Sequence, residues 1–84
     1  MIWIQSTEGG LFYAGRILKT KQIVQGKETG KIEIVNYVLT PRSEIGIEEY
    51  GILGVYNPER ADMILNDIKV AMEEGKVIFE MPQE

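Results

Sequence analysis

Apolar and polar residues alternate with a period of two along most of this chain, and that period predicts β-strands. In the first apolar segment Ile2 and Ile4 lie on one face and Trp3 on the other. The same pattern recurs in four later segments. The strands we expect cover residues 1–5, 11–25, 31–39, 50–56 and 76–81. Together with one helix, they predict an α+β domain with an antiparallel sheet of about five strands.

Glycines interrupt two of these expected strands. Gly15 lies within residues 11–25, where a bulge or bend would let one long strand curl. Gly51 and Gly54 lie within residues 50–56, and we expect a side chain or another backbone to approach them closely. Turn-forming residues predict reversals at 7–10 and at 26–30, the second a five-residue hairpin loop. Residues 82–84 are expected to fray.

A helix over residues 58–74 is marked at both ends and packs on one face of the sheet. Asn57 is expected to cap its first turn, Pro58 suits its first position, and Gly75 is expected to end it in a left-handed conformation. At 100° per residue the helix presents one apolar stripe, which we expect to face the sheet. The stripe consists of Ala61, Ile64, Leu65, Ile68, Ala71 and Met72.

Met63 and Val70 lie nearly opposite that stripe, one heptad apart. A single domain of 84 residues buries a small core, and self-association is a common way to stabilise such a chain. We therefore expect a homo-oligomer with Met63 and Val70 at an interface between subunits, although two exposed apolar residues can also be incidental.

The chain contains no cysteine and no histidine. Disulfides, thiolate metal sites, cysteine nucleophiles and Ser-His-Asp triads are therefore excluded. The usual general base at neutral pH is missing as well. We accordingly expect no catalytic residues, no metal site and no cofactor, and we interpret the protein as a binding protein rather than an enzyme.

The charge is unevenly distributed. The formal net charge is −4, but residues 1–43 carry six Lys/Arg against three Asp/Glu, whereas residues 44–84 carry three against ten. The overall acidity opposes binding to long nucleic acid. A basic surface on the hairpin of residues 16–39 is possible, or its lysines only protect an edge strand. The opening residues lack a basic start and a long apolar stretch, so we expect no membrane segment and a cytoplasmic location.

Aromatic and arginine side chains are the best candidates for a ligand site. Arg16, Tyr37, Arg42, Tyr50 and Arg60 lie in or next to expected strands. Arginine binds phosphate through two parallel hydrogen bonds, and a tyrosine ring stacks on a nucleobase. These residues therefore predict a pocket for a small nucleotide-like ligand. The alternative is that the aromatic rings fill a small core and only their hydroxyl groups reach the surface.

The run Leu-Gly-Val-Tyr of residues 53–56 leads into a helix that starts with Glu-Arg-Ala at 59–61, and the chain has an opening strand at 2–6 and a closing segment at 75–82. In these segments, which make up roughly half of the chain, the sequence resembles small phage and prophage proteins of Gram-positive hosts. Among proteins of that kind are anti-defence sponges, which bind the cyclic ADP-ribose signal of the bacterial Thoeris system without cleaving it. The resemblance implies a non-enzymatic, oligomeric protein of the infected host's cytoplasm, with Arg60 as a ligand contact.

The expected function is thus sequestration of a small cyclic nucleotide immune signal. The alternative is a protein-binding inhibitor, similar in role to an anti-CRISPR protein. Such an inhibitor would act through the acidic half of the chain or through the free edge of the hairpin.

Overall fold

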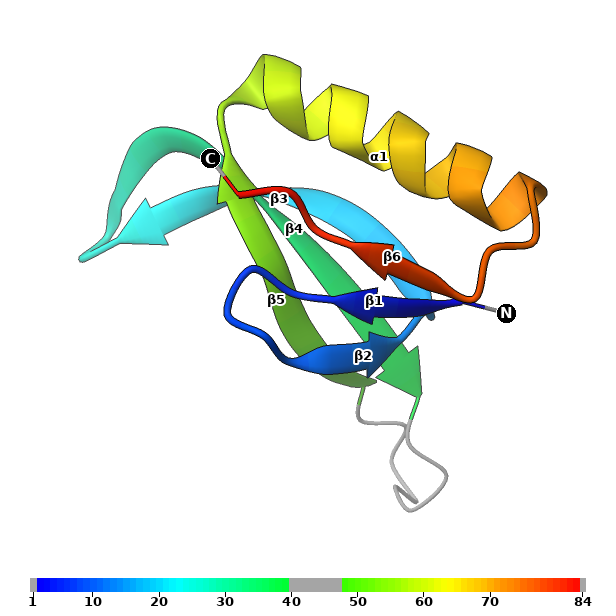
Figure 1. The fold of residues 1–84 in the computed structure, drawn as a ribbon. Helices are drawn as coiled ribbons and strands as arrows, with labels where there is room; N and C mark the ends of the chain where they lie inside the picture. Colours follow the sequence, from blue (N-terminus) through cyan, green and yellow to red (C-terminus); the bar gives the residue numbers. More distant parts are fainter. Residues whose placement is uncertain (1, 40–47, 84) are drawn as a thin grey trace.

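The computed structural model describes residues 2–39 and 48–83. Within them the chain forms two three-stranded sheets and one helix (Figure 1). This arrangement confirms the α+β class. The elements are β1 (Trp3–Gln5), β2 (Leu11–Tyr13), β3 (Arg16–Val24), β4 (Lys27–Leu39), β5 (Glu48–Tyr56), α1 (Pro58–Glu73) and β6 (Ile78–Glu80).

The expectation of one antiparallel sheet of about five strands is wrong. One sheet has the order β2-β1-β6 and the other β3-β4-β5. The chain passes from the first to the second at Ala14 and Gly15, so the expected strand 11–25 is in fact two strands. β6 also pairs with β1 in parallel, with Trp3 opposite Ile78. Alternation of apolar residues fixes which face a residue takes, but it carries no information about which strand lies alongside.

The β3–β4 hairpin turns earlier than expected. Its turn is formed by Gln25 and Gly26, with φ angles of 51° and 78°, and two positive φ values are typical of a two-residue hairpin turn. Gly30, with a φ of 84°, lies within β4, where the pairing register shifts. The expected loop 26–30 is therefore a tight turn followed by a bulge.

The prediction of close approaches at the two β5 glycines is confirmed. A Cβ atom on Gly51 would lie 2.7 Å from the Cζ atom of the Phe12 ring, and one on Gly54 would lie 2.6 Å from the Tyr56 hydroxyl oxygen. The register between β4 and β5 shifts beside Gly54, and the Thr7 amide donates a hydrogen bond of 3.0 Å to the Leu53 carbonyl there. Phe12 and Thr7 thus attach the first sheet to the second.

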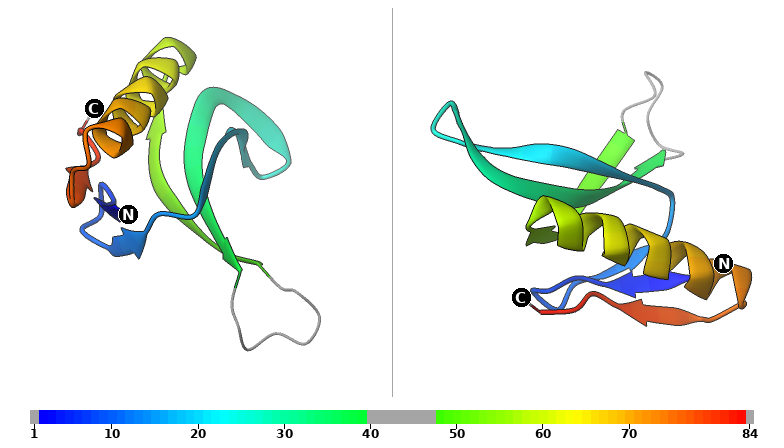
Figure 2. Two further views of the ribbon diagram at one scale, coloured as in Figure 1. Left: turned by 90° about the vertical axis from the view of Figure 1, so that its right-hand side faces the viewer. Right: turned by 90° about the horizontal axis from the view of Figure 1, so that it is seen from above.

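The helix packs on a core to which both sheets contribute (Figure 2). Four helix residues are buried, namely Ala61, Ile64, Ile68 and Ala71. They meet the buried side chains of Ile4, Ile34, Leu53 and Tyr56. Leu65 is partly buried, as expected, but Met72 is 42% exposed, so the apolar stripe is narrower than predicted.

The two ends of the helix differ from each other. Asn57 occupies the cap position but makes no side-chain capping hydrogen bond, so the predicted Asn57 cap is wrong. The predicted end at Gly75 is confirmed: its φ is 73°, its amide donates to the Met72 carbonyl, and the Lys76 amide donates to the Ala71 carbonyl. These two bonds form a Schellman motif.

Hydrogen bonds hold the C-terminal segment in place as far as Gln83. The expectation that residues 82 and 83 fray is therefore wrong. The Tyr56 hydroxyl donates a hydrogen bond of 2.7 Å to the Pro82 carbonyl, and the Gln83 side chain donates one of 3.0 Å to the Thr7 carbonyl. In the described part of the chain, no helix is long and apolar enough to cross a membrane.

Candidate ligand-binding site

Three of the five candidate residues occupy one row across the sheet β3-β4-β5. Arg16 pairs with Tyr37 between β3 and β4, and Tyr37 pairs with Tyr50 between β4 and β5. The Arg16 guanidinium carbon lies over the Tyr37 ring, 5.6 Å from its centroid. The backbone register places Tyr50 in the same row. The structure therefore brings a cation and an aromatic ring together, as the predicted site requires.

The next row on the same face of the sheet is apolar. It lies two residues away from the first row on each strand. In it, Leu18 pairs with Val35, and Val35 pairs with Ile52. Val35 is only 2% exposed, although it lies outside the main core, while Leu18 and Ile52 are 41% and 44% exposed. This face, which we call the outer face of the β3-β4-β5 sheet, combines the Arg16–Tyr37 contact with an apolar surface.

The other two arginines are not part of this row. Arg60 is exposed in the first turn of α1, which follows the far end of β5. Tyr50 and Tyr56 are six residues apart on that strand, which corresponds to about 20 Å. Arg60 therefore lies well away from Tyr37 within one chain. Arg42 lies outside the described residues.

Asn36 fixes the position of Arg16, a role that the sequence analysis missed. It is buried next to Tyr37, donates through Nδ2 to the Tyr13 carbonyl at 3.0 Å, and accepts from the Gly15 amide through Oδ1 at 2.8 Å. One side chain therefore holds both ends of the link between β2 and β3. The signal in the sequence was a single amide residue on the otherwise apolar face of residues 32–38.

The bulge at Gly30 sets the register that pairs Arg16 with Tyr37. Near the turn, Ile23 pairs with Glu28. Two residues farther from the turn on β3, Lys21 pairs with Ile32. The β4 strand therefore carries two extra residues between these pairs. Without them, Arg16 would lie opposite Val35 instead of the aromatic ring. Sequence alternation alone does not reveal such a shift, because a two-residue shift keeps every side chain on the same face.

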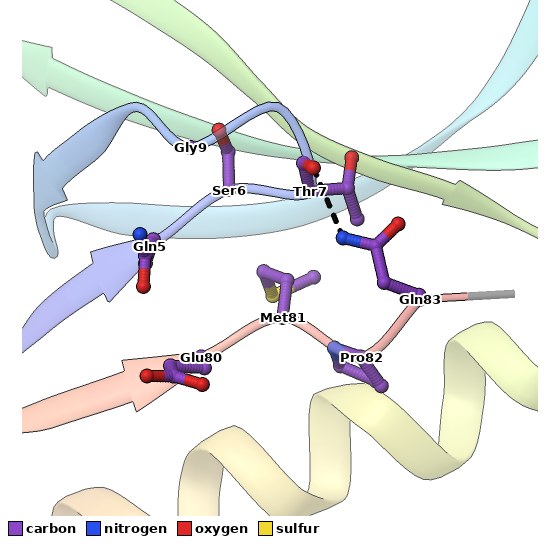
Figure 3. A pocket seen from close by; sticks show the side chains of 8 residues that line it. All are labelled: Gln5, Ser6, Thr7, Gly9, Glu80, Met81, Pro82 and Gln83. Carbon is purple, nitrogen blue, oxygen red and sulfur yellow. Dashed lines mark hydrogen bonds between the residues drawn. The ribbon is translucent and has the colours of Figure 1, made fainter.

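Two of the pockets have a different chemistry from this row. A pocket of about 360 Å³ lies beside the ends of β1 and β6 (Figure 3), where the Gln83 side chain reaches Thr7. Its lining contains Glu80 but no lysine or arginine, so it is poorly suited to phosphate. A second pocket of about 450 Å³ lies between α1 and the start of β3 and is largely apolar. Among the described residues, no three or more acidic side chains gather as a metal site.

No family model, no curated protein and no solved structure matches this chain.

Proposed function

We propose that this protein binds a small phosphate-bearing nucleotide on the outer face of the β3-β4-β5 sheet and sequesters it without catalysis. The observation that carries the proposal is the contact of the Arg16 guanidinium with the Tyr37 ring, beside the exposed apolar row of Leu18 and Ile52. A guanidinium held against a ring loses little further freedom when it binds phosphate. The base stacks on the aromatic and apolar side chains, and the phosphate binds to Arg16.

The ligand class we propose is a cyclic nucleotide immune signal, and the biological role is anti-defence in the cytoplasm of an infected host. A chain without cysteine or histidine lacks the usual groups for cleaving such a ligand, which supports sequestration. Inhibition then depends on the amount of protein and on its affinity. Arg60 contributes only if a second chain brings its helix start to this face, because within one chain it lies about 20 Å or more from Tyr37.

Calorimetry with a panel of cyclic nucleotides tests this function. We expect wild type to bind one of them, and Arg16→Ala to weaken binding tenfold to a hundredfold, because a charge-assisted hydrogen bond contributes about 1.5–3 kcal/mol. Arg16→Lys restores only part of the affinity, since an ammonium lacks the planar fork. Lys27→Ala, which removes one charge from the exposed end of the same hairpin, is the matched control and binds as wild type does.

The bound ligand is then released by heating and analysed by mass spectrometry. Recovery of the intact nucleotide agrees with sequestration, whereas recovery of a cleaved product contradicts it. If no cyclic nucleotide binds, or if Arg16→Ala and Lys27→Ala bind equally well, the site is wrongly assigned.

The outer edge of β3, which pairs with no other strand among residues 2–39 and 48–83, favours a second candidate function, protein binding by strand addition. β3 is an outer strand of its sheet and ends in the exposed side chains of Ile23 and Val24. An extended segment of a target protein could pair with this edge. In that case Lys21→Pro, which removes a backbone donor, abolishes inhibition of the target, while Arg16→Ala leaves it intact.

A further inference from the structure

The outer face of the β3-β4-β5 sheet continues beyond its apolar row into a third row, which is polar. In this row Thr20 pairs with Glu33, and Glu33 pairs with Val55. Glu33 and Val35 are two residues apart on β4 and therefore lie on the same face. Ile34, between them, is buried in the core on the opposite face, where α1 packs (Figure 2). The outer face thus presents three successive rows: one with a cation and an aromatic ring, one apolar, and one with a carboxylate.

The polar side chains of Glu33 and Thr20 have no protein partner among residues 2–39 and 48–83. Both residues are half-buried, and Glu33 lies on the central strand of its sheet. Neither side chain makes a hydrogen bond or an ion pair within the described ranges. Partial burial of a charged group without a partner is unfavourable, and ligand sites are where such polar groups find one. The carboxylate of Glu33 is therefore available to a ligand on this face.

The order of the three rows matches the order of the parts of a nucleotide. Glu33 follows Tyr37 at a separation of four residues on β4, which corresponds to about 13 Å. The apolar row of Leu18 and Val35 lies between them. A nucleotide whose phosphate binds to Arg16 and whose base stacks on the apolar row therefore directs the edge of its base towards Glu33.

The carboxylate of Glu33 discriminates between bases, because an ionised carboxylate only accepts hydrogen bonds, through two oxygens. Guanine carries two adjacent donors on its pairing edge, the ring N–H and the amino group. Adenine and cytosine carry one amino donor beside a ring nitrogen that is itself an acceptor, and uracil carries one ring N–H between two carbonyls. Thr20 lies opposite Glu33. Opposite Cβ atoms are about 5 Å apart, so the Thr20 hydroxyl can donate to the guanine carbonyl beside that ring N–H.

From these observations we infer that Glu33 is the specificity-determining residue of this face and that it selects a guanine nucleotide. The inference rests on the proposed binding of a nucleotide phosphate by Arg16 and adds the identity of the base. Met63 and Val70, the predicted interface residues, are 62% and 40% exposed on α1, which packs on the opposite face of the sheet. A subunit contact through them stays a prediction and does not involve the base.

Calorimetry with cyclic GMP, cyclic AMP and cyclic IMP tests the inference. Wild type is expected to bind cyclic GMP about tenfold more tightly than cyclic AMP, and about tenfold more tightly than cyclic IMP, which lacks the amino group. Glu33→Gln keeps the size of the side chain but turns one acceptor oxygen into a donor. It therefore weakens binding of cyclic GMP about tenfold and strengthens binding of cyclic AMP, whose edge carries one donor and one acceptor.

Glu28→Gln, the same chemical change at an exposed position of the same hairpin, is the control and keeps the preference of wild type for cyclic GMP. The inference is overturned if wild type binds the three nucleotides equally well, or if Glu33→Gln keeps the wild-type preference. In either case a loss of binding in Arg16→Ala shows that the proposed function stands and that only the choice of base is wrong. If no cyclic nucleotide binds to wild type, the proposed function and this inference are both wrong.

Discussion

Asn36 is the residue on which the candidate site depends most. Its amide group binds the Tyr13 carbonyl and the Gly15 amide, the two backbone groups that precede Arg16. Tyr37 follows Asn36 directly in β4, so one residue positions both members of the cation–ring contact. This arrangement also explains why an amide residue is tolerated at a position that is 1% exposed: both ends of its side chain are satisfied.

Replacing Asn36 with leucine is expected to destabilise the protein by about 1–3 kcal/mol, because the Tyr13 carbonyl and the Gly15 amide lose their partner. Asn66→Leu, the same substitution at an exposed position of α1, is the control and changes stability little. Urea unfolding measures the free energy of unfolding of both variants. Equal stability of the two variants would show that Asn36 does not hold the link between β2 and β3.

The helix is the element whose boundaries are clearest, and its C-terminal end is closed by capping hydrogen bonds that its start lacks. Gly75 adopts a φ of 73° and supports two hydrogen bonds that close the last turn, whereas Asn57 makes no capping bond with its side chain. The Asn57 carbonyl still accepts the first helical bond from Ala61, and any residue supplies that group.

Gly75→Ala is therefore expected to lower the free energy of unfolding by about 1 kcal/mol, since a Cβ atom is strained at this φ. Asn57→Ala is expected to cost less than about 0.5 kcal/mol, below the usual value for a lost N-terminal cap. Thermal melts of the two variants show which substitution lowers the stability more. A larger loss for Asn57→Ala would contradict it.

The periodicity of the sequence was enough to predict the elements but not their arrangement. The apolar stripe and Gly75 placed the helix, and alternation placed most strands, because both patterns are local. The parallel pairing of Trp3 with Ile78 joins opposite ends of the chain, and no local pattern encodes it. The same limit applies to the candidate site. Residue type indicates Arg16 and Tyr37 as candidates, but their contact depends on the bulge at Gly30, which shifts the register.

At the scale of the whole molecule, a few long-range hydrogen bonds hold the two sheets and the C-terminal segment together. Tyr56 is fully buried at the end of β5, with its ring over Gly54 and its hydroxyl bonded to the Pro82 carbonyl. Gln83 in turn binds the Thr7 carbonyl, next to the Thr7 amide that bonds to Leu53. These bonds link residues from both sheets around one core.

Tyr56→Phe is expected to lower stability by about 0.5–1.5 kcal/mol, because the ring still packs while one hydrogen bond is lost. The same change is expected to speed amide hydrogen exchange in residues 81–83, which lose their anchor. Tyr13→Phe, at an exposed position of β2, is the control for exchange in this segment. Unchanged exchange at the C-terminal end would show that the hydroxyl bond does not hold it.

The most direct test of the proposed function is a nuclear magnetic resonance titration of the isotope-labelled protein with the cyclic nucleotide that calorimetry selects. We predict that the largest amide shifts fall at Arg16, Leu18, Val35 and Tyr37, on the outer face of the β3-β4-β5 sheet, and that Arg16→Ala removes them. Shifts confined to the pocket between α1 and β3, or to the pocket beside β1 and β6, would contradict the assignment of the site.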